Sequence, residues 1–120
     1  MKILVCEDDF MMIRAIEHKL KSDQYEVDVA NNGNLAIEKI KLTNYDLIIT
    51  DLLMPFIGGI ELINIVRNEL SLKMPIIVLS TLSDEDSIIE AFKLGADDYM
   101  TKPFSPSEVS IRVKRLLIKR

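Results

Sequence analysis

The sequence is poor in the residues that crosslink, loosen or anchor a chain. One cysteine among 120 residues cannot form an internal disulfide, and Cys6, inside an apolar run, is expected to be a small buried residue. Four glycines and four prolines are too few for a flexible linker or a low-complexity segment. No apolar run approaches the roughly 20 residues of a membrane span. The acidic residues 7–9 follow the first apolar run at once, so we expect no signal peptide, no membrane contact and a cytoplasmic protein.

An excess of positive charge is also missing. The formal net charge is -4 and the pI is about 5.0, whereas a domain that holds nucleic-acid phosphates is usually basic. We therefore expect no direct nucleic-acid binding by this domain. The chain is 48% hydrophobic and 28% charged, which is ordinary for a globular protein with a real core. Its length suits a single domain spanning residues 1–120.

Two hydrophobic periods alternate along the chain. Nearly continuous apolar runs at residues 3–6, 47–50 and 76–80 are typical of strands covered on both faces. Residues 25–30 and 98–101 alternate more and fit strands nearer the sheet edges. The segments between these runs have the spacing of amphipathic helices. Five strands alternating with five helices predict an α/β fold, a doubly wound parallel sheet with helices on both faces.

Three local patterns mark helix ends. Residues 105–108 (SPSE) predict a capping box with proline at the first position of the last helix. Ser83, followed by three acidic residues, is expected to cap the fourth helix. Gly95 stands where a left-handed C-terminal cap would end that helix.

Chemically active side chains stand where the predicted strands end. Glu7 and Asp8 follow the first strand, Asp51 the third, Ser80 closes the fourth, and Lys102 follows the fifth. In open α/β sheets, ligands bind outside the carboxyl ends of the strands. We therefore expect these five side chains to share one rim of the sheet.

Three converging carboxylates limit what such a rim can do. Two of them about 4 Å apart repel by roughly 4 kcal/mol at an effective dielectric of 20, so either protons or a cation must sit among them. Mg²⁺ suits a few carboxylates with open water positions, and it can bridge them to a phosphoryl oxygen. Lys102 and Ser80 could meet the other phosphoryl oxygens, and a carboxylate can itself accept the group.

A plainer interpretation applies to each residue taken singly, because an aspartate at a strand end is more often a helix cap than a nucleophile. We assign that role to Asp9, which is expected to cap the first helix. Four correctly ordered signals within 120 residues favour the functional interpretation for the others.

The sequence resembles the receiver domains of two-component response regulators over essentially its whole length. The resemblance is carried by residues 3–8 (ILVCED), 46–55 (DLIITDLLMP), 75–80 (PIIVLS) and 95–104 (GADDYMTKPF). It implies a flavodoxin-like fold with strand order 2-1-3-4-5. It also implies a cis peptide bond between Lys102 and Pro103.

Position by position, the resemblance makes Asp51 the phosphoacceptor. In the same comparison, Asp8 and Asp51 match the direct Mg²⁺ ligands, and Glu7 matches an acid that acts on the ion mainly through water. The resemblance also implies that the backbone carbonyl of Leu53 supplies another ligand. Mn²⁺ is expected to substitute for Mg²⁺.

The same resemblance assigns the phosphoryl-binding and switch residues. Ser80 matches the hydroxyl that binds the phosphoryl group, and Lys102 matches the lysine that contacts it. Tyr99 matches the aromatic switch residue, whose rotamer follows phosphorylation together with the movement of Ser80.

Two loops depart from the usual pattern. The third loop has Phe56-Ile57 before two glycines, where relatives usually have Asp-Gly, so it is expected to be looser or to present Phe56 to a partner. Thr81 replaces the usual small residue after Ser80, and we expect it to narrow access to the acyl phosphate and slow its hydrolysis.

A third departure concerns the output face. The string at residues 95–99 resembles regulators with a winged-helix DNA-binding domain, which form a homodimer through helix 4, strand 5 and helix 5 by means of three charge pairs. In this chain those pairs fall on Asp98 with Arg112, Ile88 with Glu108, and Lys93 with Lys114. Only the first is retained, so we expect such a dimer to lack its usual charge pairing, although Ile89 and Phe92 could supply an apolar patch.

The expected function is a phosphorylation-activated switch that takes its phosphoryl group from a sensor histidine kinase, a phosphotransfer protein or a small phosphodonor. It is a phosphoacceptor that catalyses its own phosphorylation and dephosphorylation, not a turnover enzyme. The alternative within the family is the receiver half of a longer DNA-binding regulator, with an effector domain beyond residue 120. A flavodoxin-type electron carrier is disfavoured because the acids at residues 7–9 would repel a flavin phosphate. A phosphatase with an aspartate nucleophile would need Asp-x-Asp after the first strand, and the spacing of residues 7–9 does not match.

Overall fold

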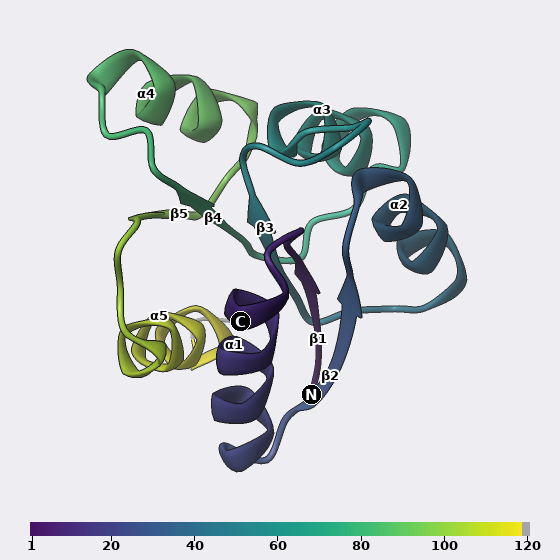
Figure 1. Cartoon of the computed structure of the whole chain (residues 1–120). Helices are drawn as coiled ribbons and strands as arrows, with labels where there is room; N and C mark the ends of the chain where they lie inside the picture. Colours follow the sequence, from purple (N-terminus) through teal and green to yellow (C-terminus); the bar gives the residue numbers. More distant parts are fainter. Residues whose placement is uncertain (119–120) are drawn as a thin grey trace.

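The computed structural model describes residues 1–118 and contains one parallel sheet with strand order β2-β1-β3-β4-β5 (Figure 1). The elements follow one another in the predicted alternation: β1 (Lys2–Cys6), α1 (Phe10–Ser22), β2 (Glu26–Ala30), α2 (Gly33–Leu42), β3 (Leu47–Asp51), α3 (Gly59–Asn64), η1 (Ile65–Glu69), β4 (Ile76–Ser80), α4 (Glu85–Leu94), β5 (Asp98–Thr101) and α5 (Pro106–Ile118). The predicted fold class and strand order are confirmed.

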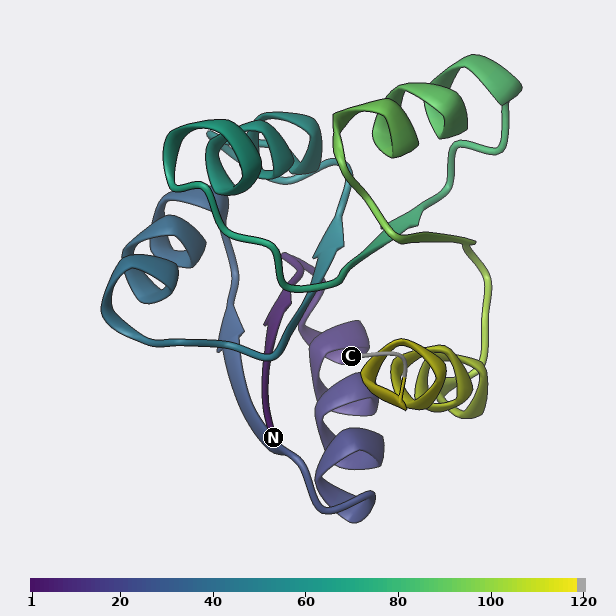
Figure 2. The same cartoon turned by 180° about the vertical axis from the view of Figure 1, so that it is seen from behind.

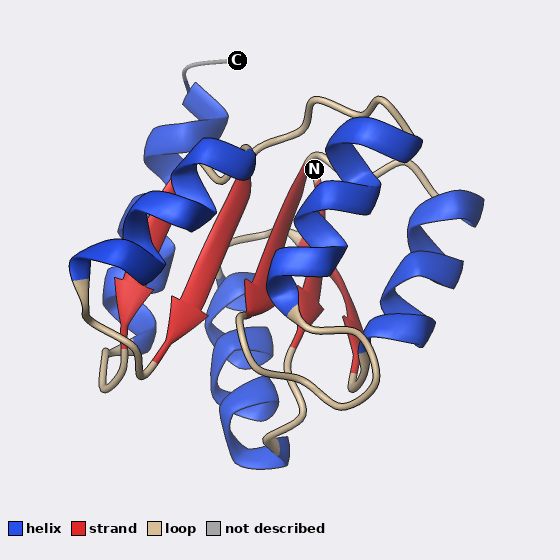
Figure 3. Ribbon diagram, turned by 90° about the horizontal axis from the view of Figure 1, so that it is seen from above, coloured by secondary structure: helices blue, strands red, loops and turns tan. Residues whose placement is uncertain are grey.

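Helices cover both faces of the sheet, with α2, α3 and α4 on one side and α1 and α5 on the other (Figures 1 and 2). Alternate residues of the central strands therefore enter two separate cores. Leu4 and Ile48 pack with the first set of helices, whereas Val5 and Ile49 pack with the second. This double burial explains why the central strands are continuous apolar runs. The view from above shows the strands lying between the two helix layers (Figure 3).

The caps of α1, α4 and α5 test the predicted helix ends. The Asp9 carboxylate accepts hydrogen bonds from the backbone N–H groups of residues 11 and 12, as expected for the α1 cap. The predicted Ser83 cap of α4 is wrong by one residue: Asp84 is the cap, because its carboxylate reaches the backbone N–H of Ser87 at 3.0 Å. At α5, the Ser105 hydroxyl accepts from the N–H of Glu108, as the capping box requires.

Helix α3 contains a feature that the sequence did not predict. After Asn64 the backbone widens into a π-helical segment, η1, which carries the chain to Glu69. Such segments are rare and occur frequently at functional sites.

None of the helices in the described residues is long and apolar enough to cross a membrane.

Candidate functional site

The predicted acids meet at the carboxyl end of the sheet. Glu7 and Asp8 directly follow β1, and Asp51 is the last residue of β3, which pairs with β1. One carboxylate oxygen from each of the three residues lies within 4.8 Å of the others. Glu7 is fully buried and Asp51 is 6% exposed, whereas Asp8 faces solvent. The parallel topology thus brings together acids that are 43 or 44 positions apart in the sequence.

Lys102 connects two of these acids. It follows β5, and its Nζ donates hydrogen bonds to Glu7 Oε1 at 2.8 Å and to Asp51 Oδ2 at 2.9 Å. The peptide bond after it, Lys102–Pro103, is cis, as the resemblance implies. Burial lowers the pKa of Lys102, but the hydrogen bonds to Glu7 and Asp51 outweigh it and raise the pKa above its usual value. The lysine therefore stays an ammonium between the two carboxylates.

The acidic cluster has more negative charge than Lys102 can neutralise. Burial chiefly, together with the neighbouring Asp51 carboxylate, raises the pKa of Glu7 to about 8 despite the adjacent ammonium. In addition, Glu7 Oε2 is a buried oxygen for which the described residues provide no hydrogen-bond partner. A buried, unpaired carboxylate oxygen is costly unless a ligand or a proton satisfies it.

The donor set fits a hard divalent cation. Three carboxylates of graded burial, one of them open to solvent, are the type of oxygen cluster that binds Mg²⁺ while leaving room for water and a phosphoryl oxygen. The backbone of Leu53 lies beside the cluster, since its N–H donates to Asp51 Oδ1 at 3.3 Å. A role for the Leu53 carbonyl as a further ligand stays a prediction.

Ser80 is the last residue of β4, Tyr99 lies within the neighbouring strand β5, and the two residues share one contact. The Ser80 hydroxyl, fully buried at the end of β4, accepts a hydrogen bond from the N–H of Leu82 at 3.0 Å. Tyr99, in β5, points inward with 9% exposure, and its hydroxyl donates to the Leu82 carbonyl at 2.7 Å. The backbone of Leu82 therefore connects both residues to the β4–α4 loop. Sequence reasoning missed Leu82, because its contribution comes from backbone groups that any residue type could supply.

The two loops that depart from the family pattern both face solvent at this end of the sheet. Phe56 is 81% exposed and has a φ angle of 70°, a left-handed conformation that is uncommon for an aromatic residue. Thr81 is also exposed, directly after Ser80.

Glycine is required at position 59, because the chain there passes close to the end of β3 and a Cβ atom would lie 2.5 Å from the backbone oxygen of Asp51.

The retained charge pair on the output face is formed within the chain. Arg112 Nη1 donates to both carboxylate oxygens of Asp98 at 2.8 and 2.9 Å, and Arg115 adds a third contact at 3.1 Å. Ile89 and Phe92 on α4 are 40% and 44% exposed, so the apolar patch expected from the sequence is present.

Fold and site together define a class of protein: a doubly wound α/β domain with an acid cluster, a lysine and a hydroxyl at one rim. The family model for the response regulator receiver domain matches residues 3–114. The transcriptional regulatory protein ResD of Bacillus subtilis is 43% identical over 116 residues, which is 97% of this chain and 48% of ResD. The alkaline phosphatase synthesis transcriptional regulatory protein PhoP of the same organism is 39% identical over 97% of this chain and 48% of PhoP.

Comparison with solved structures supports the same family. The receiver domain of the Francisella response regulator 1452 superimposes with a TM-score of 0.93 at 39% identity, covering 98% of this chain and 97% of that one. The chain therefore belongs to the response regulator receiver domain family. It spans about half the length of the curated relatives it matches.

Proposed function

We propose that Asp51 is the phosphoacceptor of this receiver domain. A carboxylate oxygen of Asp51 attacks phosphorus, a new P–O bond forms, and the bond to the donor breaks with its electron pair leaving on the donor atom. That atom is an imidazole nitrogen for a sensor histidine kinase or phosphotransfer protein, or an acetate oxygen for acetyl phosphate. The observation that carries the proposal is the convergence of Lys102, Glu7 and Asp8 on the Asp51 carboxylate.

Each neighbour of Asp51 has a part in this proposal. Lys102, an ammonium 2.9 Å from Asp51 Oδ2, is placed to follow the charge onto a phosphoryl oxygen. The Ser80 hydroxyl can donate to another, since its recorded hydrogen bond uses the oxygen only as an acceptor. Glu7, Asp8, Asp51 and the Leu53 carbonyl would hold Mg²⁺, or Mn²⁺ in its place. When bound, the ion neutralises charge on the transferring group.

The output of the switch runs through the β4–α4 loop. Movement of Ser80 toward a phosphoryl group would pull on Leu82, and the Tyr99 hydroxyl holds the same residue. The surface of α4, β5 and α5 would then change. About 5.5 kcal/mol of differential stabilisation is needed to drive a switch from mostly off to mostly on. A few charge-assisted hydrogen bonds of roughly 1.5–3 kcal/mol each could supply it.

A second proposal concerns the context of the domain. ResD and PhoP are transcriptional regulatory proteins about twice as long as this chain, which supports a role as the receiver half of a DNA-binding regulator. In that role the α4–β5–α5 face would take a second copy of the domain. The test is the oligomeric state of the phosphorylated protein by light scattering.

The phosphoacceptor proposal is tested by incubating the protein with acetyl phosphate and Mg²⁺ and measuring the intact mass. We expect a gain of one phosphoryl group that disappears in Asp51→Asn and after chelation. The matched control is Asp46→Asn, which changes the same residue type on the amino side of β3 and should leave the gain intact. A gain that persists in Asp51→Asn would contradict the assignment of the acceptor.

A further inference from the structure

Arg67 makes an unusually large set of contacts for one side chain. It lies in the π-helical segment η1, and its guanidinium donates to the Gly95 carbonyl from both Nε (3.1 Å) and Nη2 (2.9 Å). The same group donates to the Leu72 carbonyl at 2.9 Å and to the Asp97 carboxylate at 3.0 Å. The side chain is only 16% exposed. Arg67 therefore joins the η1–β4 and α4–β5 connections at the rim of the sheet opposite the acidic site.

The contacts of Arg67 fix the C-terminal end of α4. Gly95 ends the helix with a φ of 121°, a conformation that disfavours other residues, and a Cβ there would lie 2.8 Å from the Arg67 side chain. Asp97, besides binding Arg67, accepts the N–H of Ile76 at 2.9 Å and donates its own N–H to the Ile76 carbonyl at 2.8 Å. The last turn of α4 is thus fastened to η1 and to the start of β4.

The other end of α4 has no comparable attachment within residues 1–118. Residues 81–86 are all exposed, and Asp84 caps only its own helix. The hydrogen bonds that join this described segment to another element pass through Leu82, to Ser80 and Tyr99. Ala91, near the C-terminal end, is the one fully buried residue of the helix.

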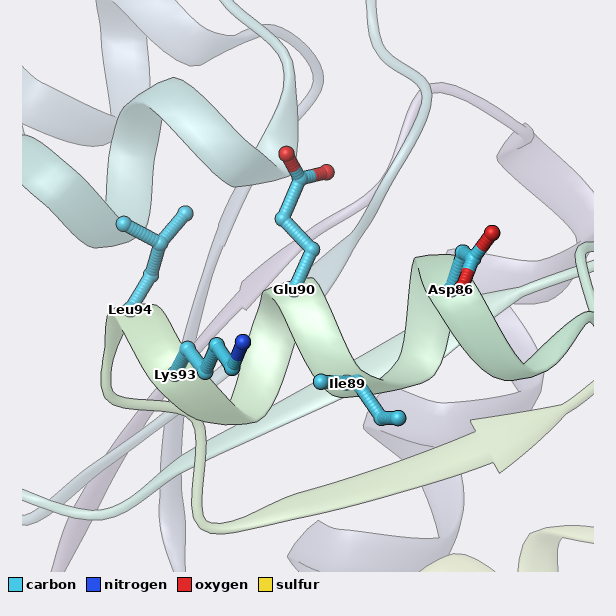
Figure 4. Close-up of a pocket in the computed structure, with 5 residues that line it drawn as sticks. All are labelled: Asp86, Ile89, Glu90, Lys93 and Leu94. Carbon is cyan, nitrogen blue, oxygen red and sulfur yellow. The ribbon is translucent and has the colours of Figure 1, made fainter.

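The outward side of α4 is also open along its length. Figure 4 shows Asp86, Ile89, Glu90, Lys93 and Leu94 lining a hollow of about 430 Å³. All five residues belong to α4 itself, so within residues 1–118 no other element lines this hollow.

We propose that Arg67 is a positioning residue that fixes the pivot of α4, so that phosphorylation of Asp51 displaces the N-terminal half of the helix while residues 91–97 stay in place. The inference rests on the proposed function, because it takes Ser80 and Tyr99 as the residues that respond to the phosphoryl group. It adds a direction: the signal enters α4 at its free end through Leu82 and stops at the Arg67 contacts.

Amide hydrogen exchange, read by mass spectrometry with and without acetyl phosphate and Mg²⁺, tests this inference. In the unaltered protein we expect the exchange rate at residues 82–89 to change by roughly tenfold on phosphorylation, which is the effect of losing or gaining one or two hydrogen bonds. The exchange rate at residues 91–97 should change by less than about twofold. In Arg67→Met, the change should extend through residues 91–97. Asp97→Asn removes the negative charge that pairs with Arg67 and keeps an oxygen that can accept the N–H of Ile76, so it should give an intermediate pattern even if Arg67→Met does not fold.

Lys93→Met is the matched control, because it removes a cation from the open side of the same helix. It should leave the unaltered pattern in place. Two results would overturn the proposal that Arg67 fixes the pivot of α4. One is an equal change in amide exchange along residues 82–97 of the unaltered protein, and the other is an exchange pattern in Asp97→Asn that is the same as in the unaltered protein. Absence of any phosphoryl gain in the intact mass would instead overturn the proposed function.

Discussion

Replacing Asp8 by asparagine should stabilise the protein in the absence of divalent ions, because it removes one of three crowded carboxylates. Two unit charges 4.8 Å apart, the outer limit for this cluster, repel by about 3.5 kcal/mol at an effective dielectric of 20 and by about 0.9 kcal/mol in water. Asp8 is exposed, and Lys102 offsets part of the charge on its neighbours. We therefore expect Asp8→Asn to raise the free energy of unfolding by about 1–2 kcal/mol, which corresponds to roughly 5 °C or more in Tm.

The assay is thermal unfolding in low salt with a chelator, repeated with Mg²⁺. Mg²⁺ should stabilise the unaltered protein by mass action and should have little effect on Asp8→Asn. The control is Asp9→Asn, which removes the same charge one residue away and keeps a side-chain oxygen to cap α1. If Asp8→Asn were no more stable than Asp9→Asn, the carboxylates would not be in mutual repulsion and the cation-site reasoning would fail.

Three further substitutions test other parts of the structure. Tyr99→Phe removes the hydroxyl that donates to Leu82 and should speed amide exchange in the β4–α4 loop severalfold. It should not slow phosphorylation, because the ring lies outside the acidic cluster. Slower phosphorylation, measured by intact mass, would contradict this expectation. Thr81→Ala should shorten the lifetime of the phosphoaspartate, measured by loss of the phosphoryl mass after the donor is removed, and an unchanged lifetime would refute a screening role for that side chain. The Ser110 hydroxyl donates to Asp23 at 2.5 Å and lowers the pKa of that carboxyl. Ser110→Ala should therefore lower the free energy of unfolding, measured by urea denaturation, by about 1 kcal/mol at neutral pH. This difference between the two proteins should shrink as the pH falls below about 3.9, because Asp23 then becomes protonated in both the folded and the unfolded state.

The parts of the fold that depend on burial could be predicted from the sequence. Ile48 and Ile49 enter opposite cores, and that double burial leaves a continuous apolar run that marks an interior parallel strand. Asp51 was predictable for the same reason, because a charged residue can end such a run only where the strand leaves the apolar layers. Since parallel strands end on the same side, the acids at positions 7, 8 and 51 had to share a rim.

Features that depend on backbone groups or on a choice between similar residues could not be predicted. Leu82 binds Ser80 and Tyr99 through its N–H and carbonyl, which no side-chain pattern encodes. Ser83 and Asp84 are both good caps, and the choice of Asp84 depends on which oxygen reaches the N–H of Ser87. Arg67 had an ordinary position in an amphipathic helix, and its partners lie up to 30 residues away.

Glu7 combines the energetic features of the site. A fully buried carboxylate with one unpartnered oxygen among the described residues, directly after β1, is unfavourable for folding. Lys102 offsets part of this cost, because its ammonium binds the other oxygen of Glu7 at 2.8 Å. A side chain such as Glu7, which lowers the stability of the ion-free protein but strengthens a cation site, is expected at positions where the residue type is selected for binding and not for stability. By this reasoning a cation bound in the cluster would satisfy the unpartnered oxygen of Glu7, and we expect the stability of the domain to depend on the divalent ion more than that of an α/β domain without such a cluster.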